Sequence, residues 1–90
     1  FKDFLDKRGF NGHFVRGIAH GIGLAFEEKP FPTIFPQDTM VELRSRMTIS
    51  VGHSLLYLPK VGGVRVEDVF LITEKGAEML VESPGELIEV

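Results

Sequence analysis

The 90-residue sequence contains no cysteine, no excess of positive charge and no long apolar run. Without cysteine the chain can form neither a disulfide nor a thiolate site, which is typical of a reducing compartment, so we expect a cytoplasmic location. The net charge of −3 gives no electrostatic reason to expect nucleic acid or an anionic membrane as a partner. No apolar run approaches the roughly 20 residues that span a bilayer.

What remains is an ordinary globular composition, with 43% hydrophobic and 26% charged residues. A chain of this length buries only about 60–65% of its unfolded surface, so it forms one small domain at most. The first residue is Phe1 rather than methionine. We therefore expect residues 1–90 to be part of a longer gene product and to lie within a single domain, without an internal boundary.

The first quarter of the chain predicts a helix followed by a glycine-rich strand. Phe1, Phe4 and Leu5 have the i, i+3, i+4 spacing of an amphipathic helix, and Gly9 follows as a stop signal. We expect a short, irregular strand at residues 18–24, where closely spaced glycines indicate that the backbone approaches another segment.

The rest of the chain predicts mostly antiparallel β structure. Three prolines indicate an extended loop over residues 27–38, after which regular structure resumes. Alternating side chains then favour strands. Within the third of these, Arg65 and Glu67 are expected to share one face, because alternate residues of a strand do so. The expected strands are Met47–Val51, Ser54–Leu58, Val64–Thr73 and Ala77–Val81.

Three segments and the tail carry a resemblance to one known family. They are Gly17–Leu24 with Pro30 after it, Asp38-Thr39 with Met47–Gly52, Gly62–Asp68 with Leu71–Glu78, and the tail Ser83–Ile88. Together they resemble the pita-bread metallopeptidases, which include prolidase, Xaa-Pro aminopeptidase, methionine aminopeptidase and the creatinase relatives. The resemblance covers nearly the whole chain. It implies an α+β fold: half of a pita-bread catalytic domain, with a curved, mainly antiparallel sheet and a helix remnant. This chain would be its carboxy-terminal portion, with the amino-terminal half of the same protein as its missing partner.

The resemblance also implies a metal site. Active members of the family hold two divalent ions with two aspartates, one histidine and two glutamates. His20 corresponds to the histidine ligand and Glu67 to the bridging glutamate, while the aspartates belong to the preceding half. Two ions about 3.5–4 Å apart polarise a carbonyl and lower the pKa of a bridging water. Manganese, cobalt or zinc is therefore the expected cofactor of the complete enzyme.

The sequence departs from the family pattern at several site positions. Ser50 stands where a second glutamate ligand is expected, and a neutral hydroxyl is a poor substitute for a bridging carboxylate. We therefore expect metal binding by this chain to be weak. Arg16 and Glu27 stand where the family places substrate-contacting histidines, four residues before and seven after His20. With Arg65, they are the expected substrate-side residues.

Local sequence also permits simpler interpretations of these residues. A glycine-flanked histidine such as His20 can be structural. Glu67 can pair with Arg65 on the same strand face, an interaction worth about 0–1 kcal/mol if exposed. His13 and His53 resemble surface or turn histidines more than ligands.

The leading hypothesis is a prolidase-like hydrolase that acts on a peptide or a small amide, with His20 and Glu67 as catalytic residues. Two alternatives stay open: a non-catalytic relative that binds a peptide or protein, and a metal-free, creatinase-like amidinohydrolase. We expect the isolated chain to be inactive and to form a homo-oligomer, because half a sheet exposes unpaired edges and an apolar face.

Overall fold

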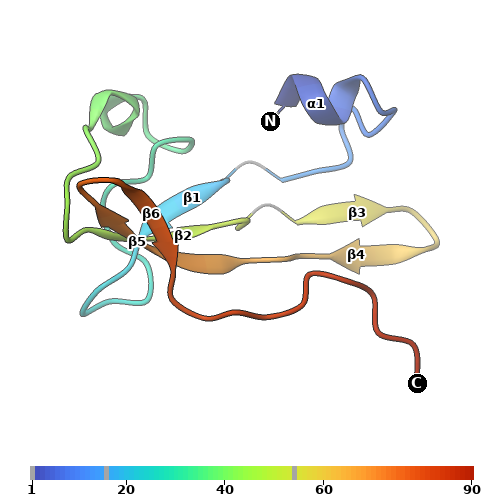
Figure 1. The fold of residues 1–90 in the computed structure, drawn as a ribbon. Helices are drawn as coiled ribbons and strands as arrows, with labels where there is room; N and C mark the ends of the chain where they lie inside the picture. Colours follow the sequence, from blue (N-terminus) through green and yellow to red (C-terminus); the bar gives the residue numbers. More distant parts are fainter. Residues whose placement is uncertain (1, 16, 54) are drawn as a thin grey trace.

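The computed structural model describes residues 2–15, 17–53 and 55–90 (Figure 1). A short helix opens the chain, and strands dominate the rest. In chain order the elements are α1 (Lys2–Asp6), β1 (Ala19–Gly21), the 3₁₀ helix η1 (Pro36–Met40), β2 (Thr48–Val51), β3 (Leu56–Leu58), β4 (Gly62–Val64), β5 (Asp68–Thr73) and β6 (Gly76–Met79).

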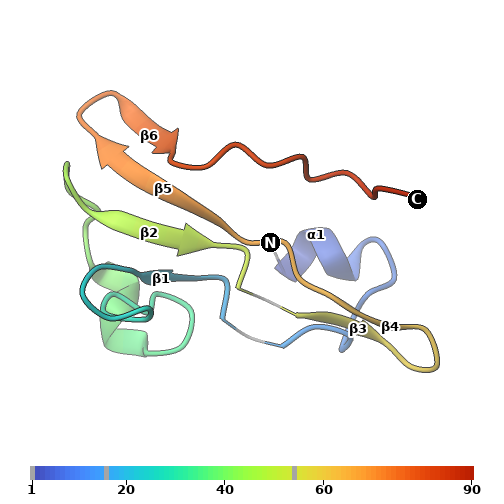
Figure 2. The same cartoon turned by 90° about the horizontal axis from the view of Figure 1, so that it is seen from below.

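The main sheet is antiparallel, with strand order β1-β2-β5-β6. Strands β3 and β4 form a separate antiparallel hairpin. In Figure 2 the chain runs from β2 into β3 and returns from β4 into β5, so the hairpin extends away from the main sheet. Consequently, the irregular residues 52–53 and 65–67 lie where the two chain segments pass between the sheet and the hairpin.

The prediction of one continuous strand over residues 64–73 is wrong. The strand is interrupted at residues 65–67, between β4 and β5. The cause lies opposite, at Gly52, whose φ of +108° is rarely adopted by residues with a side chain. A Cβ on Gly52 would overlap the carbonyl oxygen of Val66. The two backbones therefore meet too closely here for a regular ladder, and they bend together.

The other predicted elements match the structure more closely. Helix α1 ends as expected before Gly9, which has a φ of +84°. The expected strand over residues 18–24 is confirmed only for Ala19–Gly21, and the chain bends after it. The loop over residues 27–38 is not extended throughout, because η1 begins at Pro36. Proline favours the first turn of a helix, since its fixed φ suits that position and its missing N–H is not needed there.

The described residues form no buried apolar core. Three polar side chains are buried instead: His20, Asp38 and Ser50, with exposed fractions of 5%, 4% and 2%. Large apolar side chains such as Phe26 and Val61 are exposed. The radius of gyration is 14.5 Å, whereas a compact chain of this length has about 12 Å. Polar contacts and the sheet ladder, rather than an apolar centre, therefore hold the site in place.

Among the described residues, no helix has the length and apolar character that a membrane crossing requires.

We expect Gly52→Ala to destabilise the folded protein by at least about 2 kcal/mol, because alanine adds both a positive-φ penalty and an overlap with Val66. Gly85→Ala is the matched control, since nothing lies within 4 Å of the added Cβ. Denaturant unfolding of the full-length gene product measures both changes. Equal stability of the two variants would contradict this account of the break between β4 and β5.

Candidate functional site

The sheet register places the predicted site residues in one row. His20 in β1 lies opposite Ser50 in β2, and Ser50 lies opposite Val69 in β5. Glu67 lies just before β5, and its carboxylate reaches this row, because Oε1 accepts the hydroxyl hydrogen of Ser50. His20 and the segment that carries Glu67 are not neighbours in the sheet, because β2 with Ser50 lies between β1 and β5.

His20 is fixed by a hydrogen bond of its own ring. Its Nδ1 lies 2.8 Å from the carbonyl oxygen of Gly21, which can only accept, so Nδ1 carries a hydrogen. Its Nε2 then points at Oε1 of Glu67, 3.2 Å away. Gly21 is required beside it because a Cβ there would overlap the carbonyl oxygen of Lys29. This close approach of the loop buries the imidazole.

Glu67 is surrounded by donors. Its Oε1 accepts the hydroxyl hydrogen of Ser50 at 2.6 Å and lies 3.1 Å from Nδ1 of His53. Its Oε2 accepts from Nε of Arg65 at 2.8 Å and lies 2.5 Å from the Nη2 atom of the same guanidinium. Burial raises the pKa of Glu67, but these hydrogen bonds and the Arg65 charge prevail and lower it to about 2. The carboxylate is therefore ionised at neutral pH.

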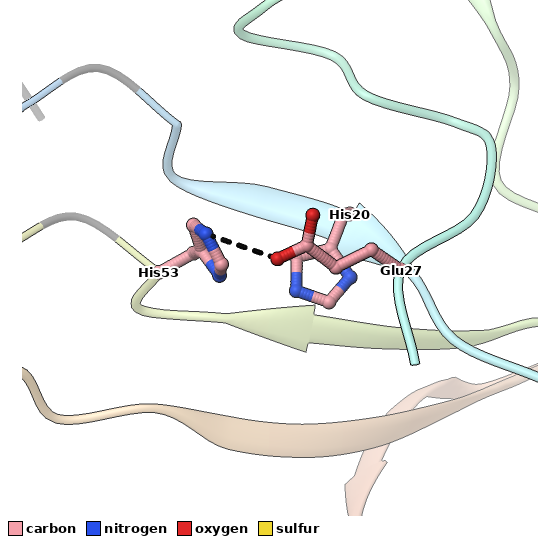
Figure 3. Close-up of side chains that lie close together, drawn as sticks. All are labelled: His20, Glu27 and His53. Atoms are coloured by element: carbon pink, nitrogen blue, oxygen red, sulfur yellow. Dashed lines mark ion pairs between the residues drawn. The ribbon is translucent and has the colours of Figure 1, made fainter. Parts of the chain in front are cut away.

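His53 and Glu27 complete the cluster, and Figure 3 shows both side chains converging with His20. His53 Nε2 lies 3.3 Å from Oε1 of Glu27. The His53 and His20 rings meet edge to face, with centroids 4.8 Å apart. His20, Glu27 and His53 each offer one ligand atom, and these three atoms lie within 4.8 Å of one another.

His53 is the residue that the sequence prediction missed, since it was assigned to the surface or a turn. His53 follows Gly52, at the bend opposite residues 65–67, and its ring faces Glu67 and Glu27. The available signal was a histidine directly after a glycine that interrupts a strand.

The predicted residues are largely brought together. His20, Glu27, Ser50, Arg65 and Glu67 all line one pocket of about 360 Å³. Its remaining lining residues are Ile22, Phe26 and Val69. Arg16, the other expected substrate-side residue, lies outside the described residues.

The donor set of this pocket fits one divalent ion rather than a carboxylate-bridged pair. His20 has the arrangement common in metal sites, with one ring N–H bound to a backbone carbonyl and the other nitrogen facing a carboxylate, that of Glu67. Position 50, however, supplies a hydroxyl that donates to Glu67, and Arg65 holds the second oxygen of that carboxylate. Glu67 therefore has little free capacity to bridge two ions.

We expect the Glu67 carboxyl to titrate near pH 2 in the folded full-length protein, against an ordinary value of 4.5. Because the folded pKa is depressed, its contribution to stability is complete above about pH 4.5 and is lost as the pH falls toward 2. Carboxyl-carbon NMR measures this pKa. Ser50→Ala should raise it by about one unit, whereas Ser45→Ala, a change at an exposed serine, should leave it unchanged. A Glu67 pKa at or above 4.5 would contradict the donor network.

Comparisons with known proteins give this site a context. The sequence model of metallopeptidase family M24 matches residues 1–74. The Xaa-Pro dipeptidase of Pyrococcus furiosus is 37% identical over 87 residues, which is 97% of this chain. The prolidase structure from Pyrococcus horikoshii superposes with a TM-score of 0.80 at 34% identity, over 97% of this chain and 24% of its own. The dipeptidase PepE structure from Mycobacterium ulcerans gives 0.82 at 32% identity, over 97% and 22% of the two chains.

The chain thus spans about a quarter of the length of the relatives it matches, 24% in the P. furiosus enzyme. Its mainly antiparallel sheet with little helix is the corresponding part of a pita-bread fold, as the sequence predicted. The family match, the sequence identity and the superposition agree. This chain belongs to metallopeptidase family M24.

Proposed function

We propose that this chain is the carboxy-terminal portion of a peptide hydrolase of the Xaa-Pro dipeptidase type. The observation that carries the proposal is the approach of His20 Nε2 to Oε1 of Glu67, at 3.2 Å in one pocket. These are the two residues that the family resemblance assigns to the metal site. Relatives that match nearly the whole chain are named Xaa-Pro dipeptidases.

In this proposal each pocket residue has a separate role. His20 acts as a metal ligand or acid-base group, and Glu67 as a metal ligand or general base. A divalent ion, manganese, cobalt or zinc, supplies polarisation of the scissile carbonyl when bound. Glu27 and Arg65 lie at the open side of the pocket, where their side chains are 36% and 43% exposed and can meet a substrate. Arg16 stays a predicted substrate-side residue, and a cytoplasmic location stays a prediction.

A metal-free, creatinase-like amidinohydrolase is the second candidate. The observation that favours it is that one pocket holds a hydroxyl, Ser50, at the expected glutamate position together with two carboxylates, Glu27 and Glu67. Ser50 donates to Glu67. Two carboxylates suit a cationic amidine or guanidine substrate through charge-assisted hydrogen bonds. In that case His20 would act as the acid-base group of the C–N bond hydrolysis.

We expect the full-length protein to hydrolyse Xaa-Pro dipeptides when manganese, cobalt or zinc is added, and the isolated 90-residue chain to hydrolyse none. His20→Ala should lower kcat/KM of the full-length protein by about 10²–10⁴-fold. His13→Ala is the control, because His13 lies in a different pocket with Tyr57, and it should keep activity within about twofold.

The outcome of that assay separates the candidates. Hydrolysis of a guanidino substrate, unaffected by chelators, together with no dipeptide turnover would support the amidinohydrolase. Absence of any turnover by the full-length protein, with retained peptide binding, would overturn both and leave the non-catalytic binding protein.

We also propose that the isolated chain forms homo-oligomers. The strands β1 and β6 are the edges of the main sheet, and apolar side chains including Met79 and Leu80 near β6 are exposed. Unpaired edges and exposed apolar surface promote association. Sedimentation velocity should show a weight-average coefficient that rises with concentration over the micromolar range. A single monomeric species throughout would contradict this proposal.

A further inference from the structure

We propose that His20, Glu27 and His53 hold a single divalent cation of the zinc class. This inference rests on the proposed hydrolase site and names the ligand set of its metal. It departs from the family pattern, because two of the three ligands, Glu27 and His53, stand at positions that the resemblance does not assign to metal binding. Nitrogen and oxygen ligands in a two-histidine, one-glutamate set are used by catalytic zinc sites.

The first argument comes from His20, where two acceptors face each other. Because Nδ1 of His20 donates to the carbonyl of Gly21, the Nε2 atom of a neutral imidazole carries a lone pair. That lone pair points at Oε1 of Glu67, which can only accept when ionised, from 3.2 Å away. Such an arrangement is repulsive unless a cation or a proton lies between the two groups.

The second argument comes from His53, which repeats the arrangement. Its Nδ1 faces Oε1 of Glu67 at 3.1 Å, and its Nε2 faces Oε1 of Glu27 at 3.3 Å. If Nδ1 donates to Glu67, Nε2 is left as a lone pair directed at a second carboxylate. A histidine ligand that gives its other N–H to a carboxylate is the common outer-shell arrangement of zinc sites.

Arg65 is the competing partner, since its Nη2 lies 2.9 Å from Nδ1 of His53 and could donate to it. The same nitrogen, however, lies 2.5 Å from Oε2 of Glu67, and Nε of Arg65 donates to that oxygen at 2.8 Å. Nη2 carries two hydrogens, so Arg65 can donate to Oε2 of Glu67 and to Nδ1 of His53 at once. In that state Nε2 of His53 carries the ring hydrogen and directs it toward Glu27, and a metal ion bound at Nε2 would shift this hydrogen to Nδ1, where Oε1 of Glu67 can accept it.

Charge favours a cation in this position. Glu27 and Glu67 bring two negative charges to the pocket, and Arg65 brings one positive charge. With neutral imidazoles the cluster is therefore negative and attracts a cation. Protons alone would have to be added to both His53 and His20 to satisfy all three histidine–carboxylate contacts. A single metal ion can instead join both Nε2 atoms and Glu27 at once.

The spacing requires a small closure that the structure permits. The three ligand atoms lie within 4.8 Å of one another, whereas bonds of about 2.1 Å in tetrahedral geometry place ligands about 3.4 Å apart. Glu27 is the arm that moves, because its side chain is 36% exposed and belongs to the irregular loop between β1 and η1. His20 is held by Gly21 and acts as the fixed ligand.

The test uses the full-length protein after chelator treatment, titrated with Co²⁺ and with Zn²⁺ by calorimetry and visible absorption. We expect His53→Gln and Glu27→Gln each to weaken the binding of one equivalent of metal by at least tenfold. His13→Gln and Glu28→Gln are matched controls and should bind as the unmodified protein does, because His13 lies in another pocket and the Glu28 carboxylate accepts from the backbone of Ala25.

Loss of fold cannot imitate this result, because Glu27 is partly exposed and circular dichroism of Glu27→Gln should match the unmodified protein. Unchanged affinity in both site variants would overturn the inference, as would absence of any metal binding. If metal binds and depends on His53 but no dipeptide is hydrolysed, the metal site stands and the proposed function falls. If dipeptides are hydrolysed and the metal affinity does not depend on His53 or Glu27, the proposed function is supported and the proposed metal site is wrong.

Discussion

The close approach of two backbones at Gly52 is the constraint on which the site depends. Because Gly52 has no Cβ, the carbonyl of Val66 can lie against it. The segment that joins β2 to β3 and the segment that joins β4 to β5 bend at this point. The bend leaves residues 65–67 outside the ladder, where Glu67 contacts Ser50 of β2 and His20 of β1, and Arg65 binds the second oxygen of Glu67. It also turns His53 inward. A regular pair of strands would keep these side chains in register with their neighbours and would not gather them.

A polar network takes the place that an apolar core has in most small domains. His20 and Ser50 are among the most buried side chains of the described residues, and the Glu67 carboxylate binds or faces four side chains. Hydrogen bonds to an ionised group are stronger than those between neutral groups, and they are stronger still away from bulk water. Such a network fixes geometry well but contributes little net stability. This agrees with an element of a larger fold, in which other surfaces supply the apolar contacts.

The sequence predicted those parts of the structure that depend on short-range patterns. The family resemblance of the segments around His20 and Glu67 identified the two facing residues, and Arg65 contacts Glu67 as expected. What it did not predict depends on contacts between distant segments. The interruption at 65–67 is caused by Gly52, more than ten residues away. Neither the hydrophobic periodicity nor the strand propensity of a segment predicts a contact with such a distant residue. His53 was missed for the same reason, since the direction of its ring follows from that bend.

The departures from the family pattern form a consistent set once the pocket is assembled. The pocket lacks a carboxylate at Ser50 but has one at Glu27, where a histidine is expected, and the imidazole of His53 contacts His20 and Glu27 beside it. The kinds of ligand are therefore retained while their positions change. A pocket that was simply losing function would have no physical reason to keep two imidazoles and two carboxylates within contact of one another, because like-charged carboxylates repel and buried polar groups cost free energy unless they are paired. Their convergence supports the proposal that a cation joins His20, Glu27 and His53.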